Sequence, residues 1–248
     1  MGTDKRQKML VVAAHAGDFV WRAGGVIAKY AKAGHEVHLI VVTYGIRGES
    51  NEYWKRENAS VEECRQIRIE ESKKAVDILG VTHADFWEYI DYPLTMDRER
   101  VERLACEIRR IRPDFILTHD KEEDLFNTDH NLTSDSVRMA YTIASGAGAY
   151  CRGLPVSPRQ TPMFGFEPQM TEICGFIPGI YIDVTDVFDA KVAAMEACAT
   201  QSRMKPHYIC KAEIRAGECR VRGGLAGCKY AEAFSTWGPV CQYDHFVW

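Results

Sequence analysis

The sequence predicts an α/β fold in which a mostly parallel sheet carries helices on both faces. Continuous apolar runs, each long enough for one strand, alternate along the chain with amphipathic stretches of helical period. Apolar runs without polar alternation are typical of strands that are buried on both faces of a parallel sheet. Right-handed crossovers between such strands give a Rossmann-like arrangement. We expect residues 1–248 to form a single domain.

The amino-terminal half predicts two strands and two helices. The apolar runs MLVVAA and VHLIVVT are the strands, and the apolar stripe that lies between them ends at Gly34, a usual helix stop. Ser60 and Glu63 have the spacing of a capping box at a helix start. In chain order we expect a strand at residues 9–14, a helix at 19–33, a strand at 37–43 and a helix at 60–79.

The remaining sequence continues the alternation of strands and helices. Its short apolar runs predict strands at residues 85–89, 115–119 and 163–166, and its amphipathic stretches predict helices at 98–111, 130–144 and 187–200. Two segments, 146–159 and 205–227, are expected to be long loops. In such folds, long loops often line the edge of the sheet that carries the active site.

Composition excludes several functional classes. A formal net charge of -4 argues against a protein that binds nucleic acid through a basic surface. Apolar runs stay well short of the ~20 residues that a membrane-spanning helix needs. The nine cysteines include no CxxC pair, which argues against a zinc finger or an iron–sulfur cluster of usual spacing. Their odd number, without a signal-peptide pattern, favours reduced thiols in the cytoplasm.

Polar side chains follow the ends of several expected strands, where an open parallel sheet binds its ligands. The turn after the first strand lacks GxGxxG, so it offers ligand-type side chains in place of a glycine cradle for phosphate. The polar groups at these ends and at the next helix start are His15, Asp18, Arg47, Glu49, His119, Asp120, Asp129 and His130. They predict a site at the carboxyl edge of the sheet.

Two imidazoles and one carboxylate, from His15, His130 and Asp18, have the composition of an open catalytic zinc site. Asp129 could orient an imidazole or move a proton. Each residue alone also has an ordinary structural role. Asp18 could be a helix N-cap, His15 a hydrogen-bonded core histidine and His130 a residue at a helix start. The residues by themselves leave both readings open.

The order HxxD, RGE and DH resembles the LmbE/PIG-L family, over residues 10–234. Members of this family are zinc-dependent, Rossmann-like enzymes, and most are N-deacetylases that act on amino sugars. The resemblance implies that His15, Asp18 and His130 bind one Zn²⁺ per chain, although another divalent metal could take its place. It also implies a homo-oligomer, since the family often forms trimers or hexamers.

The chain departs from the deacetylase pattern of this family. The family motif His-Pro-Asp-Asp-Glu places its general base at the position of Gly17 and its glutamate at the position of Phe19. A later family histidine, which helps to stabilise the oxyanion, is Asn127 here. Losing the base and the oxyanion donor together should slow amide hydrolysis by several orders of magnitude, since each contributes about 10²-fold or more.

The segments HAGDFVWRAGG, YGIRGES and EYWK resemble one branch of the family, the 4-oxalomesaconate (4-carboxy-2-hydroxymuconate) hydratases of gallate and protocatechuate breakdown. This resemblance implies a cytoplasmic enzyme that adds water to a small unsaturated oxo-carboxylic acid, without nucleic-acid or membrane partners. The candidates that it implies for proton transfer are Glu49 first, Asp129 second and His119 as a fallback. The candidates for substrate binding are Arg22, Arg47 and Glu167.

Each candidate has an alternative. Glu49 could be a solvated loop residue, Arg22 a helix-surface residue, Arg47 a loop anchor and His119 a structural residue at a strand end. Gln169 stands where the hydratase branch is expected to place a histidine acid/base, which leaves the general acid open. The alternative functions are an N-deacetylase with a base from elsewhere, such as Glu49, and a metal-binding module without catalysis.

Overall fold

The computed structural model describes residues 6–149, 151 and 153–238. Its elements, in chain order, are β1 (Lys8–His15), α1 (Asp18–Lys32), β2 (Glu36–Thr43), α2 (Asn51–Trp54), α3 (Val61–Leu79), β3 (His83–Tyr89), α4 (Arg98–Ile111), β4 (Phe115–His119), α5 (Thr128–Ser145), β5 (Met163–Phe166), β6 (Ile180–Asp183), η1 (Thr185–Val187), α6 (Phe188–Ala197), η2 (Ala199–Met204), α7 (Lys205–Arg222) and β7 (Ala231–Thr236).

Within the described residues, the strands form one sheet in the order β3-β2-β1-β4-β5-β7-β6. The pairs from β3 to β5 are parallel, whereas β7 is antiparallel to both β5 and β6. The expected mostly parallel sheet is therefore confirmed, and β6 and β7 add an edge that the sequence did not predict. Strand β1 is third in this order, and the order of the strands reverses between β1 and β4.

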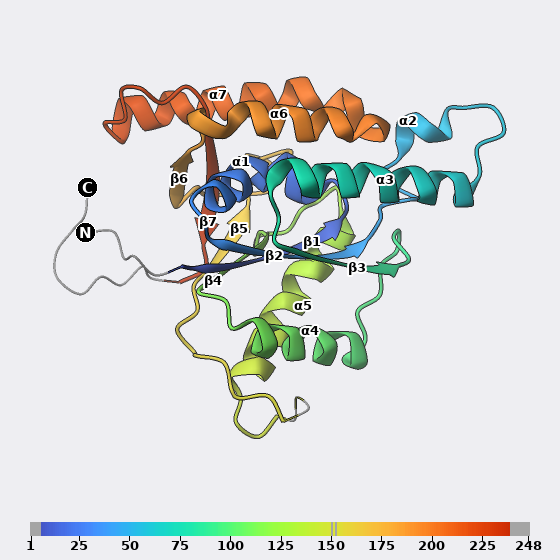
Figure 1. The fold of residues 1–248 in the computed structure, drawn as a ribbon, viewed down its shortest axis with the longest axis vertical. Coiled ribbons are helices and arrows are strands. Elements are labelled where there is room, and N and C mark those ends of the chain that lie inside the picture. The colour runs from blue at the N-terminus through green and yellow to red at the C-terminus, as the bar shows by residue number, and fades with distance from the viewer. Residues whose placement is uncertain (1–5, 150, 152, 239–248) are drawn as a thin grey trace.

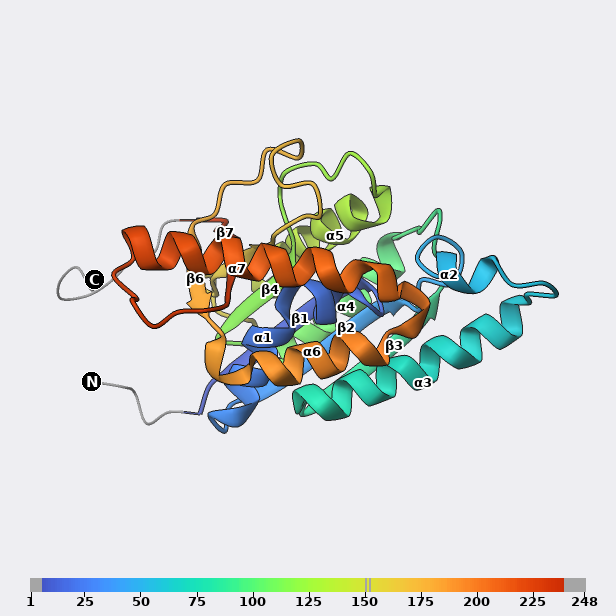
Figure 2. The same cartoon turned by 90° about the horizontal axis from the view of Figure 1, so that it is seen from above.

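Helices cover both faces of the sheet, as expected. Helices α1, α3, α6 and α7 lie over one face, and α4 and α5 lie over the other (Figures 1 and 2). Alternate side chains of β1 enter two separate cores: Val11 packs with the α1 side and Val12 with the α4 side. Burial on both faces explains why this strand is a continuous apolar run.

The helix signals of the amino-terminal half are confirmed. The Ser60 hydroxyl accepts a hydrogen bond from the Glu63 backbone N–H at 3.2 Å, as a helix N-cap does. Helix α3 ends at Gly80, whose φ of 71° lies in the left-handed region that favours glycine. No helix of the described residues is long and apolar enough to cross a bilayer.

One expected loop contains a helix. Residues 205–227 were expected to be a loop, but α7 occupies Lys205–Arg222. Pro206 lies in its first turn, where proline is tolerated because that N–H has no helical partner. Charged residues on its exposed side, such as Glu213 and Arg220, make its apolar stripe hard to recognise in the sequence. The stripe consists of Tyr208, Ala212, Ala216 and Cys219.

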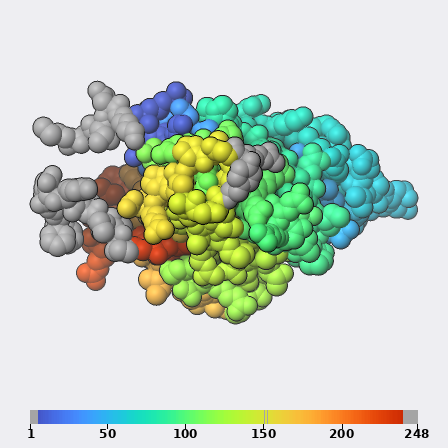
Figure 3. Space-filling model, turned by 90° about the horizontal axis from the view of Figure 1, so that it is seen from below, coloured from blue at the N-terminus to red at the C-terminus, as the bar shows by residue number. Residues whose placement is uncertain are grey.

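The other expected loop, residues 146–159, lies at the amino edge of the sheet and not at the carboxyl edge, where the site was expected. Arg109, in the last turns of α4, donates hydrogen bonds to the backbone carbonyls of Ala144, Gly146 and Leu154. Helix α4 leads into the start of β4, so this segment lies at the amino edge of the strands. Figure 3 shows it, in yellow, beside α4 and α5. It therefore does not line a site at the carboxyl edge.

The helix expected at residues 187–200 is shorter than predicted. Helix α6 ends at Ala197, and a 3₁₀ segment follows from Ala199 to Met204. Gln201 breaks the helical geometry inside this segment, with φ −124° and ψ 21°. The break turns the chain before α7 begins.

A buried ion pair joins three elements of the α1 face. The Glu232 carboxylate on β7 accepts hydrogen bonds from the backbone N–H groups of Gly25 and Val26 in α1, both at 2.8 Å. It also accepts from Lys191 Nζ of α6 at 2.6 Å, and Lys191 donates to the Trp21 carbonyl. Removing one partner would leave the other charge buried without compensation.

Replacing Glu232 by alanine should therefore lower the free energy of unfolding by about 3–5 kcal/mol, which urea denaturation at pH 7 measures. The matched control is Glu57→Ala, at an exposed position, where a change within about 0.5 kcal/mol is expected. A loss of less than about 1 kcal/mol in Glu232→Ala would show that this pair does not hold the three elements together.

Candidate metal centre and active site

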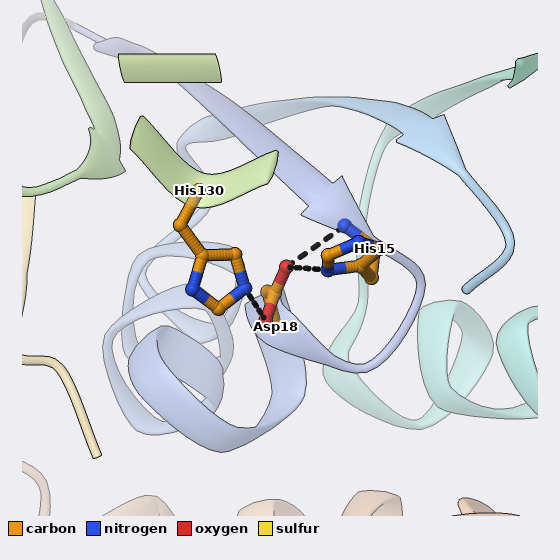
Figure 4. A group of neighbouring side chains, drawn as sticks. All are labelled: His15, Asp18 and His130. Atoms are coloured by element: carbon orange, nitrogen blue, oxygen red, sulfur yellow. Dashed lines mark hydrogen bonds and ion pairs between the residues drawn. The ribbon is translucent and has the colours of Figure 1, made fainter. Parts of the chain in front are cut away.

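Three candidate metal ligands meet at the carboxyl edge of the central strand. His15 is the last residue of β1, Asp18 is the first of α1, and His130 lies in the first turn of α5. Their ligand atoms all lie within 4.8 Å of one another, and all three residues are buried. Figure 4 shows Asp18 between the two imidazoles. This edge, where the strand order reverses between β1 and β4, is the usual ligand site of such sheets.

The Asp18 carboxylate turns back toward the strand end instead of capping the helix. Gly17 occupies the N-cap position, and Asp18 Oδ2 accepts the backbone N–H of His15 at 2.8 Å. The same oxygen lies 3.4 Å from His15 Nδ1, and Asp18 Oδ1 lies 3.3 Å from His130 Nε2. The interpretation of Asp18 as an ordinary helix N-cap is therefore wrong.

Each imidazole presents one nitrogen to this point and uses the other for orientation. His15 Nε2 pairs with Asp129 Oδ2 at 3.2 Å, and His130 Nδ1 pairs with Asp124 Oδ2 at 2.9 Å. The remaining nitrogens, His15 Nδ1 and His130 Nε2, are buried and have no hydrogen-bond partner among the described residues. Two such nitrogens beside a carboxylate fit a divalent zinc ion, with carboxylates orienting the imidazoles from behind.

The electrostatics of the cluster favour a cation. Burial alone lowers the pKa of His15, but hydrogen bonds to Asp129 and Asp18 and the charge of Glu49 raise it to about 10. Burial raises the pKa of Asp18, but His130 and His119 hold it well below its usual range. The ionised carboxylates around the cluster therefore favour positive charge there, either as a proton on His15 or as a bound cation that takes its place.

Asp129 lies behind His15 and holds a neighbouring loop. Its Oδ2 accepts the backbone N–H of Tyr92 at 2.9 Å, and its Oδ1 accepts that of Leu94 at 3.0 Å. With His15 Nε2 as a further partner, both oxygens of this carboxylate are engaged. Of the two roles considered for Asp129, the geometry supports orientation of an imidazole, and the imidazole is that of His15.

Glu49 stands beside the ligand set, on the loop that follows β2. Its Oε1 lies 3.8 Å from His15 Nδ1 and accepts hydrogen bonds from Tyr92 Oη at 2.8 Å and from Asn127 Nδ2 at 2.9 Å. Its Oε2 accepts from Gln201 Nε2 at 3.0 Å. Burial raises its pKa, but the charge of His15 and other contacts bring the pKa below the usual value. Glu49 is therefore a held, ionised carboxylate and not a solvated loop residue.

His119, the last residue of β4, lies behind the ligands. Its ring stacks on that of His130, with centroids 4.1 Å apart and planes 14° from parallel, and its Nε2 accepts the Ala14 backbone N–H at 3.0 Å. Burial and the charge of His130 lower the pKa of His119 to about 3. The imidazole is therefore neutral at pH 7, which favours a structural role over that of a proton donor.

The two candidate arginines lie in different surroundings. Arg22 is buried in α1, where Nη1 donates to the Glu167 carbonyl at 3.1 Å and Nε lies 3.6 Å from Asp18 Oδ1. It therefore supports the ligand shell and is not a helix-surface residue. Arg47 is exposed, while its backbone N–H donates to Asp91 Oδ2 at 2.7 Å. The Asp91 carboxylate thus anchors the backbone of the loop, and the Arg47 guanidinium stays at the surface.

The carboxylate of Glu167 is occupied by other side chains. Arg215 donates to both of its oxygens, at 3.0 and 2.7 Å, and Lys211 Nζ and Thr171 Oγ1 donate to Oε1 at 2.8 and 2.7 Å. Glu167 thus joins β5 to α7. These partners give Glu167 a structural role in a buried ion pair, and its part in substrate binding stays a prediction.

Three residues of the site were missed by sequence reasoning. Asp124 orients His130, while Tyr92 and Gln201 both donate to Glu49. Tyr92 lies 43 residues from Glu49 in the sequence and Gln201 lies 152 residues from it, so no local spacing signals these contacts.

The chain matches a family model over more than half of its length. The model is described as PIG-L, GlcNAc-PI de-N-acetylase, and it matches residues 10–141. Among proteins of described function, the chain is 34% identical to 4-oxalmesaconate hydratase of Pseudomonas putida, covering 94% of this chain and 90% of that protein. It is 24% identical to diacetylchitobiose deacetylase of Thermococcus kodakarensis, covering 97% and 88%.

Solved structures show the same two kinds of relative. The structure of GalB, the 4-carboxy-2-hydroxymuconate hydratase from Pseudomonas putida KT2440, superposes with a TM-score of 0.91 at 32% identity, covering 97% of this chain and all of that one. N,N'-diacetylchitobiose deacetylase from Pyrococcus horikoshii superposes with a TM-score of 0.77 at 22% identity, covering 93% and 83%. The second likeness shows the shared fold.

If His130 holds a metal, purified wild-type protein should contain about one zinc per chain, and His130→Ala should lose it. Elemental analysis of both proteins after identical purification provides the measurement. His35→Ala, which removes a histidine outside the cluster, should keep the wild-type content. Full zinc occupancy in His130→Ala would remove this residue from the ligand set.

Asp129→Asn should weaken zinc binding by about 10–100-fold, because the orienting carboxylate behind His15 is lost while the ligands stay. Competition with a chelating dye measures this affinity. An unchanged affinity would mean that Asp129 does not orient His15 for metal binding.

Proposed function

The chain belongs to the PIG-L family, and from that membership we propose that it is a zinc-dependent hydratase of a small unsaturated oxo-carboxylic acid. The proposed substrate is 4-oxalomesaconate, also described as 4-carboxy-2-hydroxymuconate, because relatives at 34% and 32% identity carry these names. The observation that carries the proposal is the placement of Glu49. It puts a held, ionised carboxylate 3.8 Å from His15 Nδ1, while position 17 is a glycine.

In the proposed mechanism, His15, Asp18 and His130 would hold the metal. The chemistry that bound zinc would supply is Lewis acidity toward a substrate carbonyl or enol oxygen. Glu49 accepts a proton from the water whose oxygen adds to one alkene carbon. The neighbouring carbon takes up a proton, which the protonated Glu49 can return, so that one water is added across the double bond. Arg47, exposed on the same loop, is the candidate partner for a substrate carboxylate.

A second candidate function is N-deacetylation of an amino-sugar conjugate. The family description and the deacetylase relative at 24% identity favour it. In this case Glu49 would activate the water that attacks the amide carbonyl. The absence of a carboxylate at Gly17 and of a histidine at Asn127 weighs against this candidate. The cytoplasmic location, the homo-oligomer and the single-domain organisation stay predictions.

Metal-replete protein should consume 4-carboxy-2-hydroxymuconate, followed as loss of the dienol absorbance, and should release no acetate from N-acetylglucosamine conjugates. The same preparation serves both assays, and a cooperative thermal unfolding transition shows beforehand that it is folded. Acetate release without dienol loss would favour the deacetylase, and no turnover of the dienol would exclude this substrate.

Glu49→Gln should lower kcat for hydration by about 10²–10⁴-fold, because the amide cannot accept the proton of the adding water. Its zinc content should stay at the wild-type value, since Glu49 lies outside the ligand set. Glu57→Gln, at an exposed position, is the matched control and should leave kcat unchanged. A wild-type kcat in Glu49→Gln would remove this residue from the mechanism.

A further inference from the structure

We infer that Gln201 is a positioning residue that orients the Glu49 carboxylate for proton transfer. This inference rests on the proposed role of Glu49 in hydration. Gln201 is buried at the break between the 3₁₀ turns that precede α7. Its side-chain amide spans the space between α1, α3 and the loop that carries Glu49.

The contacts of Gln201 fix which way its amide points. Its Oε1 accepts hydrogen bonds from Trp21 Nε1 at 3.1 Å and from Arg68 Nη1 at 3.2 Å, and its Nε2 donates to Glu49 Oε2 at 3.0 Å. An indole and a guanidinium can only donate, whereas a carboxylate can only accept. A flipped amide would lose all of these bonds, so the N–H group must face Glu49.

Arg68 gives this arrangement a rigid support. It is almost fully buried in α3, where Nε donates to the Tyr44 carbonyl at 2.8 Å and Nη1 donates to Glu71 Oε2 at 3.1 Å. The backbone N–H of Thr200, the neighbour of Gln201, donates to Glu71 Oε1 at 2.8 Å. Helix α3 therefore holds both the backbone before Gln201 and the oxygen of its amide.

Gly17 provides the room that the Gln201 amide occupies. A Cβ atom at position 17 would lie 2.1 Å from Gln201 Oε1 and 2.8 Å from Trp21 Nε1, closer than such atoms approach. Any side chain at position 17 would therefore displace the amide. Gly17 and Gln201 form a matched pair, in which the absence of a side chain on α1 lets the amide reach Glu49 from across the fold.

The result is a carboxylate held at both oxygens by three different segments. Tyr92 and Asn127 fix Oε1, and Gln201 fixes Oε2. Without Gln201, the carboxylate can rotate about its terminal torsion, and misplacement of a catalytic group by about 1 Å can cost about 10²-fold in rate. The proposal is that Gln201 sets kcat through its hydrogen bond to Glu49, since its side-chain amide pairs with Glu49, Trp21 and Arg68 and not with His15, Asp18 or His130.

The test replaces Gln201 by methionine, which keeps the length of the side chain and removes its hydrogen bonds. We expect kcat to fall by about 10–100-fold, with KM changed less than about 3-fold and the zinc content unchanged. Gln66→Ala, at an exposed position of α3, is the control and should leave kcat unchanged. Gly17→Ala, which displaces the amide without removing it, should lower kcat in the same way.

A double-mutant cycle with Glu49 separates positioning from general structural damage. Because Gln201 acts through Glu49, Gln201→Met should lower kcat little or not at all in the Glu49→Gln background. Equal losses in both backgrounds, or a wild-type kcat in Gln201→Met, would overturn the inference.

The inference and the proposed function can fail separately. If the wild type releases acetate and does not hydrate the dienol, the same cycle is measured on acetate release. Independently of activity, the side-chain ¹H–¹⁵N signals of Gln201, assigned by their loss in Gln201→Met, should shift in Glu49→Gln. Unshifted signals would show that Gln201 does not contact Glu49, whatever reaction the protein catalyses.

Discussion

The site depends on one buried carboxylate, that of Asp18. It accepts the backbone N–H of His15 and lies between the two imidazoles that face it from β1 and α5. A buried charge needs partners, and these two partners come from the end of a strand and from the start of a helix more than a hundred residues further along the chain. Asp18 therefore links the folding of the sheet edge to the assembly of the metal-binding cluster.

The surroundings of this carboxylate determine what the cluster can bind. Asp129 and Asp124 each hold the far nitrogen of one imidazole, so that the near nitrogens are left for a ligand. Arg22 Nε lies 3.6 Å from Asp18 Oδ1 and balances part of the negative charge, while Glu49 adds a negative charge 3.8 Å from His15 Nδ1. This division gives an inner set suited to zinc and an outer carboxylate, held in place by three donors, for the proposed proton transfer.

Sequence reasoning predicted what depends on local pattern and missed what depends on tertiary contacts. His15, Asp18 and Glu49 were found because parallel strands end at one edge of a sheet. Gln201 was not found, because its partners lie on α1, α3 and the loop after β2. Helix α7 was missed because charged residues on its exposed side, and a glycine within it, obscure the apolar stripe.

The central claim is that two imidazoles and a carboxylate hold the metal, with no sulfur ligand although the chain has nine cysteines. X-ray absorption at the zinc edge of the metal-loaded protein tests it most directly. The account predicts nitrogen and oxygen neighbours at about 2.0–2.2 Å, with the outer-shell scattering of two imidazoles. A sulfur neighbour at about 2.3 Å, or scattering from fewer than two imidazoles, would contradict it.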